Sequence, residues 1–337
     1  MIKKFMTKRI GMFIMSIALF AVLQALAAAG ILNPYHLQIL SLMCINIILA
    51  VSLNLINGFT GQFSIGHAGF MAVGGYTAAL MTNSLRPILP IGTNPVVTFF
   101  VFIIVLVCAG LVSAFIGFLI GLPTLRLRGD YLAIATLGFG EIIRVIIVNL
   151  DVIGGPRGYG GMPRITSFTW AFFVMLACVY VISNFINSTH GRACISIRED
   201  EIAAETMGID TTKYKVIAFT MGAFFAGVAG ALFAHLLTYL NPSMFGFLKS
   251  IDILVMVVIG GLGSITGSIA SAVFITLLTE FLREFVELRM VIFSLMLIVV
   301  MLTRPQGLLG NKEFSLDMFK SIGAKKRARK GEDSHEA

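Results

Sequence analysis

The segment GRACISIREDEIAAETMGIDTTKYK, residues 191–215, is a charged island in a chain that is otherwise almost entirely apolar. Ser196 and Glu199 have the spacing of a capping box, and Gly208 can end a helix in the left-handed conformation. The pattern predicts one short helix of about 10 residues that protrudes from an apolar body into water. An ordinary solvated loop helix is one interpretation of the island, and a helix that docks a partner is the other. The island carries five of the 17 acidic residues: Glu199, Asp200, Glu201, Glu205 and Asp210.

The composition is that of an integral membrane protein. Hydrophobic residues make up 57% of the chain, the mean hydropathy is +0.93 and only 12% of residues are charged, whereas soluble domains have about 25% charged residues. Apolar runs recur that can cross a hydrocarbon core of about 30 Å. We therefore predict an all-α polytopic transmembrane helical bundle of about eight to ten spans, in which 250–262 is too short to cross alone and forms a bent or re-entrant unit with its neighbour. The predicted spans are 10–30, 36–56, 63–82, 96–121, 131–150, 168–187, 215–240, 250–262, 264–282 and 289–303.

The distribution of Lys and Arg predicts the orientation. With the N-terminus inside, 18 of the 25 basic residues fall in cytoplasmic segments, as the positive-inside rule expects. Both termini and the island at 191–215 are then cytoplasmic. Residues 25–30, ALAAAG, imitate a signal-peptide cleavage site, but we expect an uncleaved first helix. The net charge of +8 reflects this topology and does not indicate a nucleic-acid partner.

The C-terminal tail and the cysteines have simple interpretations. KKRARK at 325–330 predicts contact with anionic lipid of the cytoplasmic leaflet, and a solubilising tail is the alternative. The four cysteines have neither metal-ligand nor CxxC spacing, so we predict no metal site. Cys194, the only one outside the predicted spans, should react with an impermeant maleimide from the cytoplasmic side.

Glycines cluster at NGFTGQFSIGHAGFMAVGGY, residues 57–76. Tight helix packing explains most glycines of membrane helices. A discontinuous helix along a transport pathway, with N–H groups that face a carboxylate, is the functional alternative. The pathway candidates in this segment are Gly61, Gly66, His67 and Gly69.

Two further glycine-rich motifs lie in predicted loops. GGLGSITG at 260–267 superficially resembles a nucleotide-binding loop, but the G-x-x-x-x-G-K-[ST] pattern occurs nowhere in the chain. The chain therefore cannot hydrolyse ATP by that route, and these glycines are predicted to form a sharp turn between two spans. GGPRGYGGMP at 154–163 predicts a surface loop of fixed shape. No catalytic motif and no cofactor site are apparent.

Few ionisable residues lie within the predicted spans. Such residues are functional candidates by default. Glu141 and Arg144 share a helix face at a spacing of three, which favours a structural ion pair over a proton relay. His235 and Glu280 lie near predicted helix ends.

Six motifs of the chain are distinctive in combination: GQFSIGHAGFMAVGGY (61–76), LRGDYLAIATLGFGEIIR (127–144), GGPRGYGGMP (154–163), GRACISIREDEIAAETMGID (191–210), GGLGSITG (260–267) and RPQGLLG (304–310). Together they resemble a known family, the permease subunits of branched-chain amino-acid ABC importers, and most nearly the longer, M-type (LivM-type) permease. The resemblance covers roughly residues 30–310. It implies a transmembrane permease domain at 1–310, with a cytoplasmic coupling helix at about 191–212, and a basic cytoplasmic tail at 311–337.

The resemblance implies a multi-pass protein of the bacterial plasma (inner) membrane that works in a complex. Its partners would be a second permease subunit, identical or homologous, two cytoplasmic ATPase subunits and a periplasmic or extracellular substrate-binding protein. In that family the island corresponds to the loop that docks into the ATPase. The positions that resemble the coupling motif are Glu199, Asp200, Ala203, Ala204 and Gly208.

Three alternatives remain open at the level of sequence. The same importer class could carry urea or short amides in place of leucine, isoleucine and valine. A proton- or sodium-coupled carrier would normally have more intramembrane carboxylates and inverted repeats. A passive channel would not need the acidic island. Retention of an ATPase by this subunit would discriminate the importer from the other two.

Overall fold

The computed structural model describes residues 17–285 except 19, 28, 31 and 128, together with 291–292, 294–296, 298–299 and 302. Within that part, six helices are long and apolar enough to cross a membrane, which confirms the all-α polytopic bundle. The predicted spans 10–30 and 289–303 are only partly described, and the tail at 311–337 lies outside the described residues. The count of about eight to ten spans therefore stays a prediction.

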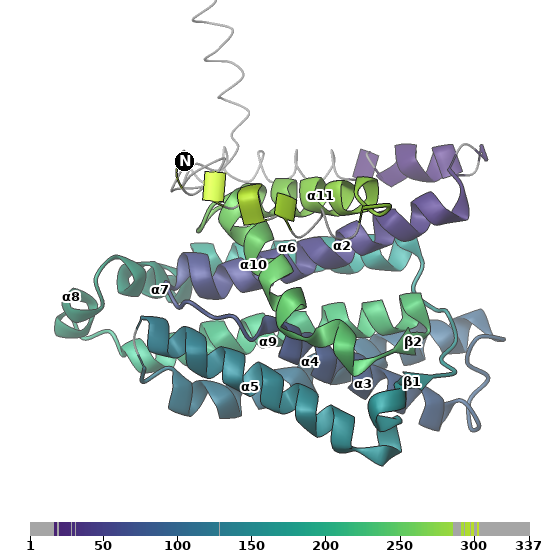
Figure 1. Cartoon of the computed structure of the whole chain (residues 1–337), viewed down its shortest axis with the longest axis horizontal. Coiled ribbons are helices and arrows are strands. Elements are labelled where there is room, and N and C mark those ends of the chain that lie inside the picture. Colours follow the sequence, from purple (N-terminus) through teal and green to yellow (C-terminus); the bar gives the residue numbers. More distant parts are fainter. Residues whose placement is uncertain are drawn as a thin grey trace, which may run out of the picture.

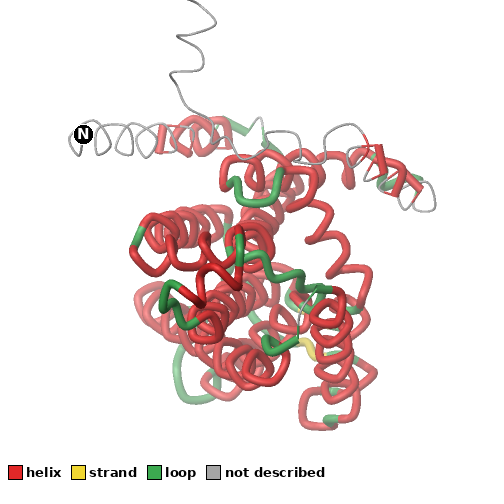
Figure 2. Tube along the Cα trace, turned by 90° about the vertical axis from the view of Figure 1, so that its left-hand side faces the viewer, coloured by secondary structure: helices red, strands yellow, loops and turns green. Residues whose placement is uncertain are grey.

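Most of the long helices run side by side, with α7 and α8 projecting at one end of the bundle and the short strands β1 and β2 at the opposite end (Figures 1 and 2). In chain order the elements are α2 (Pro34–Asn54), the π-helix η1 (Leu55–Phe59), α3 (His67–Leu85), α4 (Pro95–Thr124), α5 (Asp130–Asn149), η2 (Asp151–Ile153), η3 (Gly155–Arg157), β1 (Tyr159–Gly160), α6 (Phe168–Asn187), α7 (Thr189–Glu199), α8 (Glu201–Thr206), α9 (Thr211–Leu237), β2 (Tyr239–Leu240), η4 (Pro242–Phe245), α10 (Phe247–Gly260) and α11 (Ile265–Phe281).

Helix α9 is the centre of the bundle, and it packs most extensively on α3 and α4. Glycines let these backbones approach closely. A Cβ atom at Gly74 would lie 2.1 Å from the carbonyl oxygen of Gly227, and one at Gly230 would lie 1.9 Å from that of Met71. Close approach through small residues is the usual means of helix association in membranes. Tight packing therefore explains Gly74 and its neighbours on α3.

Two helices are interrupted at the places where the sequence has glycine clusters. Helix α2 widens into η1 and is followed by residues 60–66, which are not helical, before α3 begins at His67. Helix α10 alone has 14 residues, or about 21 Å, but with η4 it forms the 19-residue candidate span Pro242–Gly260, which is longer than the predicted 250–262. The sharp turn predicted at GGLGSITG is confirmed, because Gly261 and Gly263 separate α10 from α11 with positive φ angles.

The loop predicted at 154–163 is held in a fixed shape at the end opposite α8. Strand β1 pairs antiparallel with β2, so that Tyr159 lies opposite Leu240. The loop is also anchored to the end of α3, because Arg86 Nη1 donates to the carbonyl of Gly161 at 3.0 Å. This end of the molecule is therefore far from the charged island.

Candidate functional site

The charged island contains most of α7, all of α8 and the start of α9, which corrects the prediction of a single helix that starts at Ser196. Helix α7 already begins after Ser188, whose Oγ accepts a hydrogen bond from Gly191 N at 3.3 Å. Ser196 lies near the end of α7 and donates to the carbonyl of Ala193 at 2.8 Å. The capping box of Ser196 and Glu199 is therefore wrong, because the earlier serine already caps the helix.

Asp200 divides the island and starts α8. Its backbone is extended, with φ −156° and ψ 110°, so α7 cannot continue through it. Its Oδ1 atom accepts hydrogen bonds from Ile202 N at 2.9 Å and Ala203 N at 3.0 Å. An aspartate in this position is a favourable N-cap. Gly208, with φ 83°, follows the end of α8, as predicted.

The surface of α8 is unusually apolar for a short projecting helix. Ile202 is 66% exposed and Met207 is 82% exposed, and Ala203 between them is also exposed. The acidic side chains of Glu199 and Glu205 are exposed as well. Ala204, by contrast, is only 5% exposed and faces the rest of the chain. The two predicted alanines therefore lie on different faces of α8, one exposed and one buried.

Arg198 joins the island to the interrupted helix η1. Its Nη1 donates to the carbonyl of Gly58 at 3.0 Å, and its Nε and Nη2 donate to the carboxylate of Glu199. Gly61 lies beneath this side chain, where a Cβ atom would be 3.0 Å from Arg198 Cγ. Gly61 has φ +71°, a conformation that favours glycine. It therefore contacts the island and does not line the intramembrane pocket described below.

Lys215 makes a second connection between the island and the same segment. Its Nζ lies 2.7 Å from Glu201 Oε2, although the residue is only 7% exposed. The carbonyl of Lys215 accepts a hydrogen bond from Gln62 Nε2 at 3.2 Å. Sequence patterns revealed neither the contact of Arg198 with Gly58 nor that of Lys215 with Gln62, because these partners are far apart in the chain.

The turn at GGLGSITG also lies against the end of α2, immediately before η1. Asn54 at the end of α2 donates from Nδ2 to the carbonyl of Ser264 at 2.9 Å and to Ser268 Oγ at 2.8 Å. Its Oδ1 accepts from Gly263 N at 2.9 Å. Three separate sequence motifs, near 58–62, 198–201 and 263–268, therefore meet at one junction.

His67 is buried at the start of α3 and contacts a buried serine of α2. Its Nε2 lies 2.8 Å from Ser52 Oγ, and the residue has no exposed surface. Its Nδ1 has no hydrogen-bond partner among the described residues. His67 does not line the pocket, whereas its neighbours Gly66 and Gly69 do.

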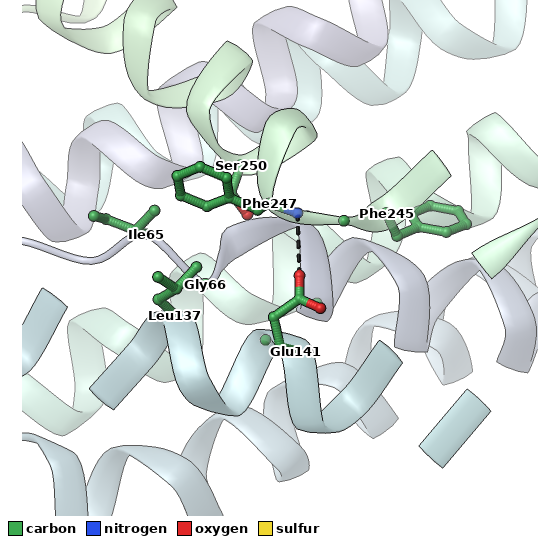
Figure 3. Close-up of a pocket in the computed structure, with 10 residues that line it drawn as sticks. Ile65, Gly66, Leu137, Glu141, Phe245, Phe247 and Ser250 are labelled. Atoms are coloured by element: carbon green, nitrogen blue, oxygen red, sulfur yellow. Dashed lines mark hydrogen bonds between the residues drawn. The ribbon is translucent and has the colours of Figure 1, made fainter. Parts of the chain in front are cut away.

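A narrow pocket lies where the starts of α3 and α10 face α5 (Figure 3). It is partly open to the surroundings and too narrow to hold a water molecule. The helices around it are in close contact, because a Cβ atom at Gly66 would lie 2.2 Å from the carbonyl oxygen of Thr136. The lining residues are Ile65, Gly66, Gly69, Leu137, Gly140, Glu141, Phe245, Gly246, Phe247 and Ser250.

Glu141 is the charged residue of this pocket, and its side chain points toward the first residues of α10 (Figure 3). Oε1 accepts a hydrogen bond from Phe247 N at 3.2 Å, and Oε2 accepts from Arg144 Nε at 2.6 Å. The predicted pairing with Arg144 is confirmed. The capping of α10 was missed, because Phe247 is 106 residues away in the chain and no local pattern records it.

Helix α5, which carries this ion pair, is the least buried of the six long apolar helices in the described part. Both charged side chains are about one-third exposed. A charge in a transmembrane segment is costly unless it faces a partner or a water-filled cavity. The open side of α5 is therefore unsuited to contact with lipid alone.

Residues 35–301 match the family of the branched-chain amino acid transport system permease component. The chain belongs to this family. It is 36% identical to the high-affinity branched-chain amino acid transport system permease protein LivM of Salmonella typhimurium, over 85% of this chain and 74% of that protein. It is 35% identical to LivM of Escherichia coli K12, over 81% of this chain and 69% of that protein.

A second type of permease is also related. The chain is 32% identical to the permease protein LivH of Escherichia coli K12, over 42% of this chain and 46% of that protein. No solved structure matches the chain. The family and the long apolar helices make this chain a multi-pass membrane protein and a permease component of a transport system.

Proposed function

We propose that this chain is the M-type permease subunit of an ABC importer that moves leucine, isoleucine and valine across the bacterial plasma membrane. The names of the LivM relatives support the substrate class. The second permease would be a LivH-type subunit, because relatives of both types match the chain. A substrate-binding protein outside and two ATPases inside complete the complex, and this subunit has no catalytic site of its own.

The apolar tip of α8 is the single observation that carries the role of the island. Ile202, Ala203 and Met207 are exposed there without an apolar neighbour to cover them. A groove in a cytoplasmic ATPase would bury them, while the surrounding carboxylates pair with basic residues at its rim. Residues 189–210 are then the coupling element, with Asp200 and Gly208 as its structural stops and Ala203 in contact with the ATPase. Ala204 would support the helix from beneath.

The transport pathway is proposed to run along the open side of α5, past the pocket at Gly66 and Gly69. The pocket is narrow in this conformation, and the ion pair of Glu141 and Arg144 lies beside it. A zwitterionic amino acid carries both charges, so a wall that offers both would stabilise its passage. The second permease would cover the remainder of this face.

Glu141→Gln is expected to lower leucine uptake by about tenfold or more, because hydrogen bonds to a charged group contribute about 1.5–3 kcal/mol. Glutamine keeps the shape and can still accept from Phe247 N, so the amount of inserted protein should change little. Glu280→Gln is the matched control, since Glu280 pairs with Arg283 at the same spacing but at the end of α11. Equal uptake by both variants would show that the ion pair of Glu141 and Arg144 does not contribute to transport.

The orientation predicts that α8 is cytoplasmic, and a cysteine at Met207 can test it. Native Cys194 is a poor probe, contrary to the expectation from sequence, because burial raises the pKa of its thiol to about 11 and the thiolate is the reactive form. In cells that express the permease without its ATPases, so that the tip of α8 is uncovered, Met207→Cys should add strong labelling by an impermeant maleimide in inside-out vesicles and none in intact cells. Ile88→Cys, in the loop after α3, should show the reverse. Labelling of both variants from one side would overturn the topology.

The substrate and the energy source can be tested together in a strain that lacks this chain. Uptake of labelled leucine should be lost and should return on complementation, whereas urea uptake should not change. Leucine uptake should depend on ATP and persist when a protonophore collapses the proton gradient. Loss of urea uptake would favour the amide-importing alternative, and abolition by the protonophore would favour a proton-coupled carrier.

A further inference from the structure

We infer that Arg198 transmits movement of the docked α8 helix to the non-helical segment 60–66 and thereby to the pocket. This inference rests on the proposed function, in which an ATPase moves α8. Arg198 is a positioning residue in this scheme. It acts through the backbone of the interrupted helix and has no contact with the transported molecule.

The guanidinium group of Arg198 is held from two sides. Two of its nitrogens donate to Glu199, the last residue of α7, while Nη1 donates to the carbonyl of Gly58 at 3.0 Å. Carbonyl groups at the end of a helix have no partner within it and carry partial negative charge. Gly58 lies one residue before η1 ends, so a cation there satisfies a group that the interruption leaves free.

The fit depends on the backbone at Gly61. The Cα atom of Arg198 would lie only 3.2 Å from a Cβ atom at Gly61, so the backbones of α7 and of the non-helical segment are in direct contact. The hydrogen bond from the Arg198 side chain to Gly58 and the backbone contact at Gly61 connect α7 at two points to the same four-residue stretch, 58–61. Movement of α7 relative to this stretch would break both.

The start of α8 is also tied to this region, through Lys215 of α9. Lys215 pairs with Glu201 at 2.7 Å, and its carbonyl accepts from Gln62 at 3.2 Å. Connections before and after α8 thus converge on residues 58–62. Gly66, four residues further on, lines the pocket. Four residues of chain span at most about 13 Å, so a displacement at residues 58–62 is carried along the backbone directly to Gly66.

The test measures transport and ATP hydrolysis in the same proteoliposomes, which contain the complete complex with its ATPases and binding protein. In Arg198→Ala, leucine uptake per ATP hydrolysed should fall about 5- to 150-fold, the effect of losing a typical coupling between two sites. ATPase retention and hydrolysis should stay near the parental values. Arg198→Lys should be intermediate, since one ammonium replaces a planar group with several donors. Arg126→Ala, at an exposed arginine after α4 and outside the coupling element, should not change the ratio.

A disulfide distinguishes mechanical transmission from general support of the fold. A Cβ atom at Gly61 would lie 3.3 Å from Arg198 Cβ, close to the separation of about 3.5–4.5 Å in disulfides. The double variant Arg198→Cys, Gly61→Cys should be uncoupled when reduced and should regain coupling when oxidised. Failure to oxidise, equal ratios in both redox states, or a parental ratio in Arg198→Ala would each overturn the inference. Failure of the proposed function is a distinct result, in which the parental complex retains no ATPase or imports no leucine.

Discussion

Replacing Ile202 with Asp should remove most of the ATPase from the purified complex. The isoleucine is 66% exposed at the tip of α8, and its burial in a partner groove would contribute about 1.5–3 kcal/mol. This corresponds to a loss of about 10- to 150-fold in affinity, before the cost of burying a new carboxylate is added. The measurement is the amount of ATPase that co-purifies with the tagged permease, together with leucine uptake.

The control for this variant uses an isoleucine at the opposite end of the molecule. Ile88 is 76% exposed in the loop that follows α3, so Ile88→Asp makes the same chemical change on another surface. It should leave ATPase retention unchanged. Ala203→Trp should also reduce retention, because a bulky side chain enlarges the exposed tip. If Ile202→Asp retains as much ATPase as Ile88→Asp, α8 is an ordinary solvated helix.

The structure also changes how a substitution at Ala204 should be interpreted. From sequence alone, Ala203 and Ala204 are equivalent small residues of a docking motif. Because Ala204 faces inward, Ala204→Trp would displace α8 from its support and would test the local fold more than the partner contact. Adjacent residues of a helix lie on different faces, and which one faces the partner depends on where the helix begins.

Local patterns predicted the features that depend on neighbouring residues. Apolar runs located the long helices, Gly208 located the end of α8, and the spacing of Glu141 and Arg144 predicted their ion pair. The start of the island helix was predicted wrongly, because Ser188 and Ser196 both have the chemistry of a cap and only the packed chain decides between them. Sequence patterns alone offered no way to choose.

Contacts between distant segments could not be predicted at all. Arg198 reaches Gly58 across 140 residues, and Asn54 reaches Ser264 across 210. The glycines at 57–76 illustrate the same limit, since packing and a pathway were equally good interpretations of them. The structure assigns Gly74 to packing against α9, Gly61 to contact with Arg198, and Gly66 to the pocket. Each assignment depends on a partner from another part of the chain.

Gly74→Val should abolish accumulation of folded protein. A Cβ atom at this position would lie 2.1 Å from the carbonyl oxygen of Gly227 and 2.3 Å from its Cα atom. Overpacking costs about 1–3 kcal/mol where side chains can shift, and here the obstacle is the backbone of α9. Helices α3 and α9 would have to separate, with loss of contacts across the centre of the bundle. The measurements are the amount of monodisperse protein after extraction in detergent and its thermal stability.

Gly138 provides the matched control for Gly74, because it is also a glycine within a long apolar helix. A Cβ atom there would meet nothing within 4 Å, so Gly138→Ala should leave the amount of folded protein unchanged. Its stability should even rise slightly, since alanine is favoured over glycine within helices by about 0.8–1.0 kcal/mol. Gly74→Ala should already be destabilised relative to Gly138→Ala. If the two alanine variants are equally stable, α3 and α9 are not in the close backbone contact on which the bundle depends.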